Sequence, residues 1–331
     1  MTSASTRAAA GRTPAVGALL RRNAWSLGLM VFLFALLAFT KAINHNYDAT
    51  GIQNLAISIL PLAFATVAQA IVVISGGIDL ALAAIMALTS TVAAVLMKGQ
   101  SEPFAILVVA GVLLLGLLIG AVNGGLVVVT RVPDIVVTLA MSYVWAGFAL
   151  LILVRPGGGS ATWLKEILSG SILSEWIPKA AVVLVVIVAG TWIPLMRSRL
   201  GLSLYAIGSN RLAAFRSGIS VGRTRLIAYM LAGFFCALGG ISLTATTGIA
   251  TPVPGPYTLN SVAAIVLGGV SLAGGRGGIV GPIIGVLILQ LVRTDMTFLN
   301  FNTDLATVLQ GVILIGVVMI GSLLEIRRAR A

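Results

Sequence analysis

The sequence predicts an all-α integral membrane protein, folded as one bundle of about ten transmembrane helices. Of its 331 residues, 59% are hydrophobic and only 9% are charged, and the mean hydropathy is +1.09. A soluble domain has about a quarter of its residues charged. Apolar runs without an internal Lys, Arg or Glu recur along the whole chain, and most are long enough to cross about 30 Å of hydrocarbon as helices.

The apolar runs divide the chain into ten expected spans. The first is longer than the apolar part of a signal peptide and no small-residue cleavage site follows it, so we expect it to be retained. The bundle should cover residues 23–325, between a disordered tail at 1–22 and a basic tail at 326–331. The spans are Ala24–Thr40, Gln53–Ser75, Leu80–Met97, Phe104–Thr130, Ile135–Val154, Ala180–Met196, Leu226–Thr247, Leu259–Leu272, Ile279–Leu291 and Leu305–Leu324.

The distribution of basic residues orients the bundle. Placing the N-terminus inside puts most of the 21 Lys and Arg residues in cytoplasmic segments, as the positive-inside rule requires. An even number of spans then makes both termini cytoplasmic. The net charge of +12 reflects this topology and attraction to anionic lipid, because it is spread over one membrane face; it does not indicate nucleic-acid binding.

Residues for catalysis or metal binding are scarce. Cys236 is the only cysteine and His45 the only histidine, so neither a metal cluster nor a nucleophilic triad can be assembled. Despite 38 glycines, the chain has no Gly-Lys-Ser/Thr sequence to hold a nucleotide. "GGRGG" at 274–278 is best explained as a tight turn. We expect no cofactor, no metal and no enzymatic activity.

Glycines recur at intervals of four in two places, where small residues on one helix face permit close helix packing. The two expected seams are Gly116, Gly120 and Gly124, and Gly277, Gly281 and Gly285.

Asp79, in "ISGGIDLALA" at 74–83, is an acid between two long apolar runs. It follows Ser75-Gly76-Gly77, which breaks the helical pattern. One interpretation is structural, because an Asp at a helix start accepts backbone N–H bonds. The other is that a broken helix at this depth lines a solute pathway. "GGIDLA" at 76–81 also resembles "GGVSLA" at 268–273, a weak internal repeat.

The longest cytoplasmic loop, at 197–225, carries six arginines but also Ala213-Ala214-Phe215 between flanking glycines. Solvation explains the charges, whereas the apolar residues suit a short helix that docks in a groove of another protein.

Four ordered motifs resemble the permease subunits of bacterial ABC importers for simple sugars of the ribose, xylose and arabinose type. They are "ISGGIDLALAAIMALTS" at 74–90, "AVNGGLVVVTRVPDIVVTLA" at 121–140, "GLSLYAIGSNRLAAFRSGISVGR" at 201–223 and "GGVSLAGGRGGIVGPIIG" at 268–285. The resemblance implies a membrane subunit that pairs with a second permease subunit, identical or different, receives sugar from a periplasmic binding protein and is driven by a cytoplasmic ATPase.

The resemblance also implies which residues couple the subunit to the ATPase. These are Gly208, Asn210, Ala213, Ala214, Ser217 and Gly218, with Arg211 standing where relatives usually carry an acid. Moving solute uphill requires a free-energy source, which the partner must supply; it would shift the bundle between outward-open and inward-open states.

Candidate residues of the pathway are Asp79, Asn123 and Trp145. The last two have ordinary alternatives, an interhelical hydrogen bond and core packing. Outer loops at 155–163 and 252–257 suit docking of a binding protein. The competing classes are a self-sufficient carrier or channel, which would need ion ligands or a pore ring, and a membrane enzyme. The sequence does not identify the sugar.

Overall fold

The computed structural model describes residues 24–302 and isolated positions between 305 and 319. It confirms the helical class that the sequence predicts. Within the described residues the only strands form a short hairpin of β1 (Ser171–Ile172) and β2 (Ser174–Pro178), inside a segment expected to be loop. The expected tails at 1–22 and 326–331, and most of the expected span Leu305–Leu324, lie outside the described residues.

The helices follow the expected order closely, with bounds that differ by a few residues. They are α2 (Ala24–Ile43), α3 (Ala49–Ile74), α4 (Leu82–Met97), α5 (Glu102–Thr130), α6 (Asp134–Ile152), α7 (Thr162–Leu168), α8 (Lys179–Arg197), α9 (Arg199–Ser209), α10 (Arg211–Arg216), α11 (Val221–Thr247), α12 (Tyr257–Leu267) and α13 (Val280–Phe298).

Six described helices are long and apolar enough to cross a membrane, namely α3, α5, α6, α8, α11 and α13. Helices α4 and α12 have only 16 and 11 residues. At 1.5 Å per residue, α12 rises about 16 Å, roughly half the hydrocarbon thickness. The expected span Leu259–Leu272 is therefore wrong beyond Leu267, where Gly269 takes a left-handed conformation (φ 82°) and ends the helix.

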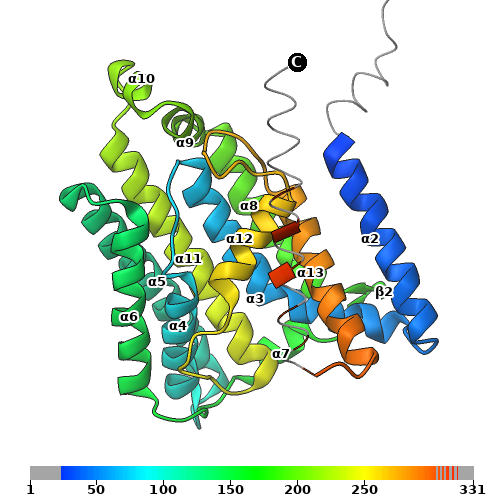
Figure 1. The fold of residues 1–331 in the computed structure, drawn as a ribbon. Helices are drawn as coiled ribbons and strands as arrows, with labels where there is room; N and C mark the ends of the chain where they lie inside the picture. The colour runs from blue at the N-terminus through cyan, green and yellow to red at the C-terminus, as the bar shows by residue number, and fades with distance from the viewer. Residues whose placement is uncertain are drawn as a thin grey trace, which may run out of the picture.

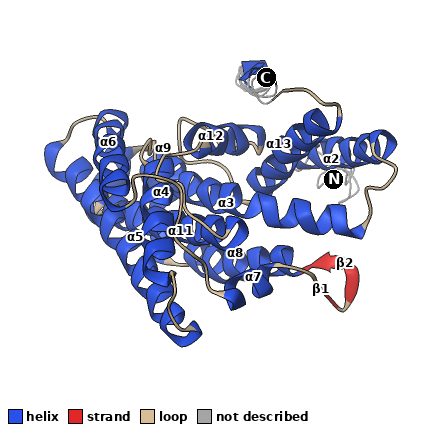
Figure 2. Ribbon diagram, turned by 90° about the horizontal axis from the view of Figure 1, so that it is seen from below, coloured by secondary structure: helices blue, strands red, loops and turns tan. Residues whose placement is uncertain are grey.

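Helix α3 lies at the centre of the bundle and is the most buried of the spanning helices. On one side it contacts α11, which packs on α5 and α4; on the other it contacts α12 and α13, and α13 packs on α2. Figures 1 and 2 show these two groups on either side of α3, with α9 and α10 together at one end of the molecule. We call this end the α10 end.

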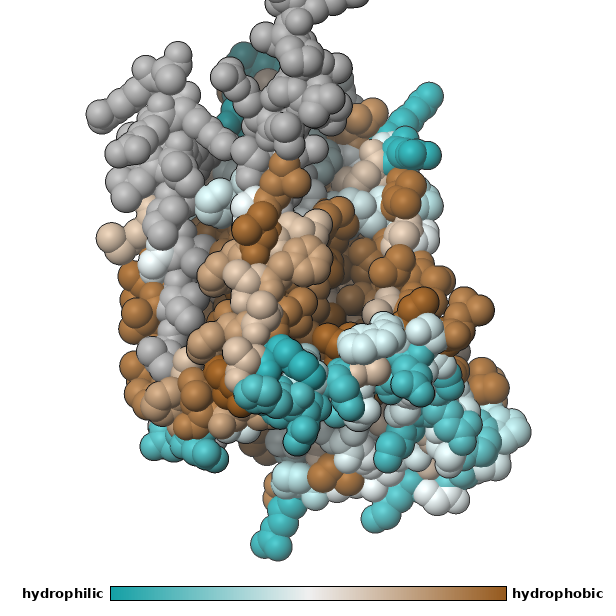
Figure 3. All heavy atoms as spheres, turned by 90° about the vertical axis from the view of Figure 1, so that its right-hand side faces the viewer, coloured by the Kyte–Doolittle hydropathy of each residue, from teal (hydrophilic) through white to brown (hydrophobic). Residues whose placement is uncertain are grey.

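The outer helices expose apolar side chains, because the bilayer removes the need to bury them. Helix α6 is the clearest case, with Tyr143, Leu151 and several other large side chains exposed. Figure 3 shows apolar residues over the middle of one face, and hydrophilic residues gathered at the end opposite α10.

The first glycine seam lies where α5 meets α11. A Cβ atom at Gly116 would overlap the carbonyl oxygen of Gly233, and one at Gly120 would overlap that of Tyr229. Gly124 lies against the Tyr229 side chain. The two backbones therefore approach as closely as small residues permit.

The second seam is shorter than expected. Gly281 and Gly285 of α13 lie against Gly268 and Ala264 at the end of α12. Gly277 does not share their helix face, because α13 begins only at Val280 and Gly277 has a φ of 132° that a helix excludes. This corrects the expectation that the three glycines line one helix.

Candidate functional site

The break between α3 and α4 is a buried turn at the α10 end of α3. Gly76 takes a left-handed conformation (φ 81°), and the amide of Gly77 donates to Val72 O, as in a common helix C-cap. The turn after α12 repeats this cap, with Gly269 left-handed and the amide of Val270 donating to Ile265 O. The left-handed residue is the first glycine of "GGIDLA" but the second glycine of "GGVSLA". The two repeated sequences therefore end their helices with the same cap, shifted by one residue.

Asp79 is completely buried in this turn. Its Oδ1 accepts a 2.8 Å hydrogen bond from the amide of Ala81, just before α4 begins. Its Oδ2 has no partner within the described residues. Oδ1 of Asp79 therefore accepts a backbone N–H bond, as the structural interpretation expects. Oδ2 makes no hydrogen bond among the described residues and is available for another partner.

A second acid, Asp134, lies beside the same turn. It is the first residue of α6, and its Oδ2 forms an ion pair with Arg225 of α11 and accepts a 2.8 Å hydrogen bond from the Tyr229 hydroxyl. A Cβ atom at Gly77 would overlap this carboxylate oxygen. Gly77 is thus required for the acid and the turn to meet, two residues before Asp79.

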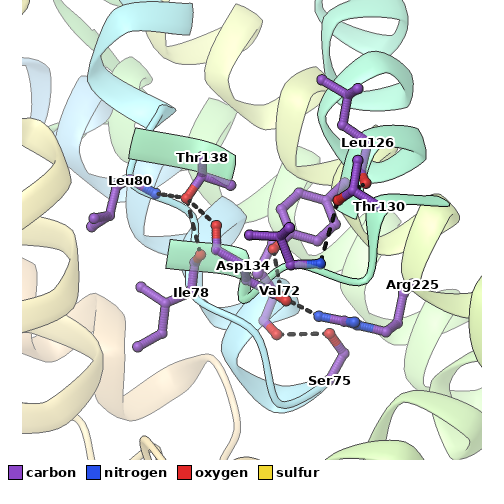
Figure 4. Close-up of polar contacts among 11 residues, drawn as sticks. Val72, Ser75, Ile78, Leu80, Leu126, Thr130, Asp134, Thr138 and Arg225 are labelled. Atoms are coloured by element: carbon purple, nitrogen blue, oxygen red, sulfur yellow. Dashed lines mark hydrogen bonds and ion pairs between the residues drawn. The ribbon is translucent and has the colours of Figure 1, made fainter. Parts of the chain in front are cut away.

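Thr138 fastens the first turn of α6 to the break. Its hydroxyl donates to Asp134 O (2.9 Å) and accepts from the amide of Leu80 (3.0 Å). Figure 4 shows Thr138 bonded to the 78–80 segment, with Asp134 between that segment and Arg225. We call Asp79, Asp134, Arg225 and Tyr229 the polar junction.

The sequence reading missed three of these four residues. From the sequence, Arg225 is one of six arginines in the loop at 197–225, and neither Asp134 nor Tyr229 is a candidate site residue. A signal was present, since an acid that opens a helix directly after a proline marks the start of α6 and is a candidate partner for a nearby arginine. The arginine that it pairs with is 91 residues away.

The end of α9 and the turn at 274–275 meet the α3–α4 break through glycine backbone. The amide of Gly275 donates a 3.0 Å hydrogen bond to Ile74 O, at the end of α3. A Cβ atom at Gly208 of α9 would overlap both of these groups, and one at Gly274 would lie 2.9 Å from the Cα of Gly76. Backbone therefore packs directly on backbone where α9, the turn at 274–275 and the break before Asp79 meet.

Helices α9 and α10 form a compact unit. Asn210 caps α10 by accepting from the amide of Ala213 (2.9 Å), and Gly218 ends it with φ 83°. Ala214 is buried against Ile207 and Val221, which joins α10 to its neighbours.

The exposed side of α10 combines two large apolar side chains with the charges of Arg211 and Arg216. Leu212 is 59% exposed and Phe215 is 66% exposed, three residues apart on one side of the helix. Arg211, Ala213 and Ser217 are exposed beside them. Arg211 stands in the first turn, where the helix dipole favours an acid, so its charge is not explained by the stability of α10.

Asn123 and Trp145 bond to each other and not to Asp79. The indole Nε1 of Trp145 in α6 donates a 3.0 Å hydrogen bond to Asn123 Oδ1 in α5, and Asn123 is fully buried. No hydrogen bond within residues 24–302 joins either residue to Asp79. The geometry is that of an interhelical hydrogen bond, the ordinary alternative weighed for Asn123.

The family model described as "Branched-chain amino acid transport system / permease component" matches residues 51–318, which include α3 without its first two residues, α4 to α13 and every part of the polar junction. The chain belongs to this permease family. It is a multi-pass protein of the inner membrane, and the family resemblance drawn from the four motifs is confirmed.

Curated relatives cover most of the chain. The ribose import permease protein RbsC of Bacillus subtilis (strain 168) is 32% identical over 89% of this chain and 92% of its own length, and RbsC of Escherichia coli (strain K12) is 31% identical over 88% and 92%. The D-allose transport system permease protein AlsC of Escherichia coli (strain K12) is 31% identical over 76% and 77%. No solved structure shows significant similarity to the chain.

Proposed function

We propose that this permease moves a small sugar into the cytoplasm as the membrane subunit of an ATP-driven, binding-protein-dependent importer. The names of the relatives, which transport ribose and allose, support the solute class. The single observation that carries the coupling part is the α9–α10 unit, which presents Leu212 and Phe215 outward and contacts the α3–α4 break through Gly208.

The motor docks on the exposed side of α10. A pair of exposed apolar side chains on a short, well-anchored helix suits insertion into a groove of a partner ATPase. Arg211 beside it fits an acidic residue on that partner. Because Ala214 fixes α10 to α9 and α11, the unit moves as one body when the ATPase closes.

The movement reaches the transport path at the polar junction. Gly208 lies against Ile74 and Gly275, so displacement of α9 shifts the break at Asp79. Arg225 lies in the second turn of α11, nine residues after α10 ends at Arg216, and its pairing with Asp134 on α6 gives one state of the bundle a specific contact. Alternating access requires a second state in which these residues make a different contact.

Asp79, with its free oxygen, remains our candidate for the pathway, and Asn123 and Trp145 are secondary candidates.

In this proposal the bundle has about ten spans and both termini are cytoplasmic, so that the α10 end faces the ATPase. The opposite end then faces the binding protein. Our candidates for that contact are the loops at 155–163 and 252–257. Paired backbone hydrogen bonds (3.0 and 2.8 Å) join Gly157 of the first loop to Ala250, two residues before the second. A second permease subunit completes the path, and lipid surrounds the pair.

The test is co-purification and uptake with the cognate ATPase and sugar-binding protein of the proposed importer. Leu212→Asp with Phe215→Ala should abolish co-purification of the ATPase and ATP-driven sugar uptake in proteoliposomes. Leu173→Asp is the matched control, because Leu173 is 99% exposed in the hairpin segment far from α10, and it should retain the ATPase. Uptake by the permease alone, driven by an ion gradient without ATPase, would overturn the proposal.

A further inference from the structure

The β1–β2 hairpin carries large apolar side chains that the described part of the chain leaves uncovered. Leu173, between the two strands, is 99% exposed, and Trp176 of β2 is 63% exposed. Ile172 and Ile177 are exposed as well, and Glu175 is the only charged residue of the hairpin. Contiguous apolar side chains of this kind mark a surface that contacts another molecule or a membrane.

The backbone of Leu173 makes its exposure more unusual. Its φ of 64° lies in the left-handed region, which Gly, Asn and Asp adopt more readily than Leu. One of those residues would stabilise a turn that faces water. A Leu is accounted for if its side chain is buried against an apolar medium, because that burial offsets the cost of the backbone conformation.

The base of the hairpin is fixed to the bundle. The side-chain amide of Gln53, near the start of α3, donates a 2.8 Å hydrogen bond to Glu175 O. The backbone amide of Lys179 donates to Gly170 O (3.0 Å), which closes the hairpin where α8 begins. The apolar side chains are therefore held in a defined position outside the bundle.

Helix α8 sets the depth of the hairpin in the membrane. Its 19 residues rise about 28 Å at 1.5 Å per residue, close to the hydrocarbon thickness of about 30 Å. Lys179 and Arg197, at its two ends, therefore lie at the two edges of the hydrocarbon. Trp176 is three residues before Lys179, at most about 10 Å along an extended strand. This places Trp176 at the boundary between membrane and water, where Trp is enriched.

The hairpin projects sideways from the bundle. Figure 2 views the bundle from the end opposite α10 and shows β1 and β2 at its periphery, beyond α7. The hairpin leads directly into α8, which exposes Val185 and Val186 in the middle of the membrane span. A soluble binding protein would approach the end of the bundle. A sideways position that continues into a lipid-facing helix indicates contact with lipid.

We propose that the β1–β2 hairpin is a membrane-surface anchor, which inserts Leu173 and Trp176 between the lipid headgroups and the upper part of the acyl chains. Through its bonds to α3 and α8 it fixes the depth of both helices at one face of the membrane. The anchor requires only that the chain is a membrane protein, so it is independent of the solute and of the direction of transport.

The first experiment measures the surroundings of Leu173 in the full chain, in phosphatidylcholine nanodiscs. Cys236, the only cysteine, is completely buried, so a single new cysteine can be labelled with the fluorophore NBD. Quenching of the label at Leu173→Cys by a nitroxide near the headgroup end of the lipid acyl chain is compared with quenching by aqueous iodide. Val186→Cys is the lipid-facing control and Arg216→Cys, exposed on α10, is the water-facing control. The ratio of lipid quenching to iodide quenching at Leu173→Cys should exceed that at Arg216→Cys several-fold.

Trp176 provides a second measurement without a label. Trp176→Phe should lower the fraction of tryptophan emission that the lipid nitroxide quenches, because it removes an indole in the headgroup region. Trp163→Phe is the matched control, since Trp163 of α7 packs against the core, and it should not lower that fraction.

Three results would overturn the inference. One is iodide quenching at Leu173→Cys equal to that at Arg216→Cys, and another is a quenched fraction that Trp176→Phe leaves unchanged. The third is protection of the label by protein. Protection from both quenchers would assign the hairpin to a second copy of the chain, and protection that requires added sugar-binding protein would assign it to that protein.

Discussion

Arg225 of α11 pairs with Asp134 at the start of α6, although the two residues are 91 positions apart and belong to helices that also flank the α3–α4 break. Their side chains are only 5% and 14% exposed, respectively. The Tyr229 hydroxyl, one turn along α11 from Arg225, donates to the same carboxylate oxygen. The pair therefore fixes the relative position of two helices at the α10 end of the bundle.

Breaking the pair from one side should destabilise the protein strongly. Arg225→Met leaves Asp134 as a buried charge with only the Tyr229 bond, and removal of one partner from a buried pair costs about 3–5 kcal/mol. The loss is measured as a lower unfolding midpoint in detergent.

Arg223→Met is the control for this prediction, because Arg223 lies two residues earlier on α11 and is exposed. It should unfold like the unmodified chain. The double variant Asp134→Leu/Arg225→Met should recover much of the lost stability, since no unpaired charge remains. Equal midpoints for Arg225→Met and Arg223→Met would contradict the assignment of a buried pair.

A methyl group in the α5–α11 seam should separate the two helices. Gly120→Ala places a Cβ against the Tyr229 carbonyl, and overpacking of this kind costs about 1–3 kcal/mol. Gly125→Ala on the same helix meets nothing within 4 Å and should be neutral or slightly stabilising, because Ala favours a helix over Gly. Thermal unfolding of the two variants tests the seam, and the prediction fails if both respond alike.

The two roles of Asp79 can be separated by comparing amide and methyl replacements. Asp79→Asn keeps an oxygen for the Ala81 amide and should retain stability to within about 1 kcal/mol, whereas Asp79→Ala loses the bond and should cost about 0.5–2 kcal/mol. If the free Oδ2 serves the pathway, sugar uptake by the stable Asn variant falls. Normal uptake by Asp79→Asn would make the residue structural alone.

The hydrogen bond between Trp145 and Asn123 should stabilise the contact of α5 with α6. Trp145→Phe removes the donor and leaves Asn123 Oδ1 buried without a partner, at a cost of about 1–3 kcal/mol. Replacing Asn123 by Leu in that background should restore part of the loss. A double-mutant cycle of unfolding free energies gives the coupling, and a coupling near zero would refute the bond.

Much of the candidate coupling unit could be predicted from the sequence, and much of the polar junction could not. Asn210 and Gly218 mark the ends of α10 by local rules, since an Asn caps a helix start and a left-handed glycine ends one. The sequence marks Asp134 locally as an acid that opens α6 after a proline, but no local pattern points to Arg225 as its partner. The outward direction of Leu212 likewise depends on which side of α10 packs on α11, which no local pattern specifies.

The sequence by itself determined that this chain is a helical membrane protein of the permease family, and where most of its spans lie. Those properties follow from hydropathy over about 20 residues and from contiguous motifs, both of which are local. Tertiary structure alone decided that Gly76, Gly208 and Gly275 meet, that Arg225 selects Asp134, and that Gly277 leaves the helical seam. These are contacts between segments far apart in the chain, where backbone approach and burial, which depend on the whole bundle, choose the partner.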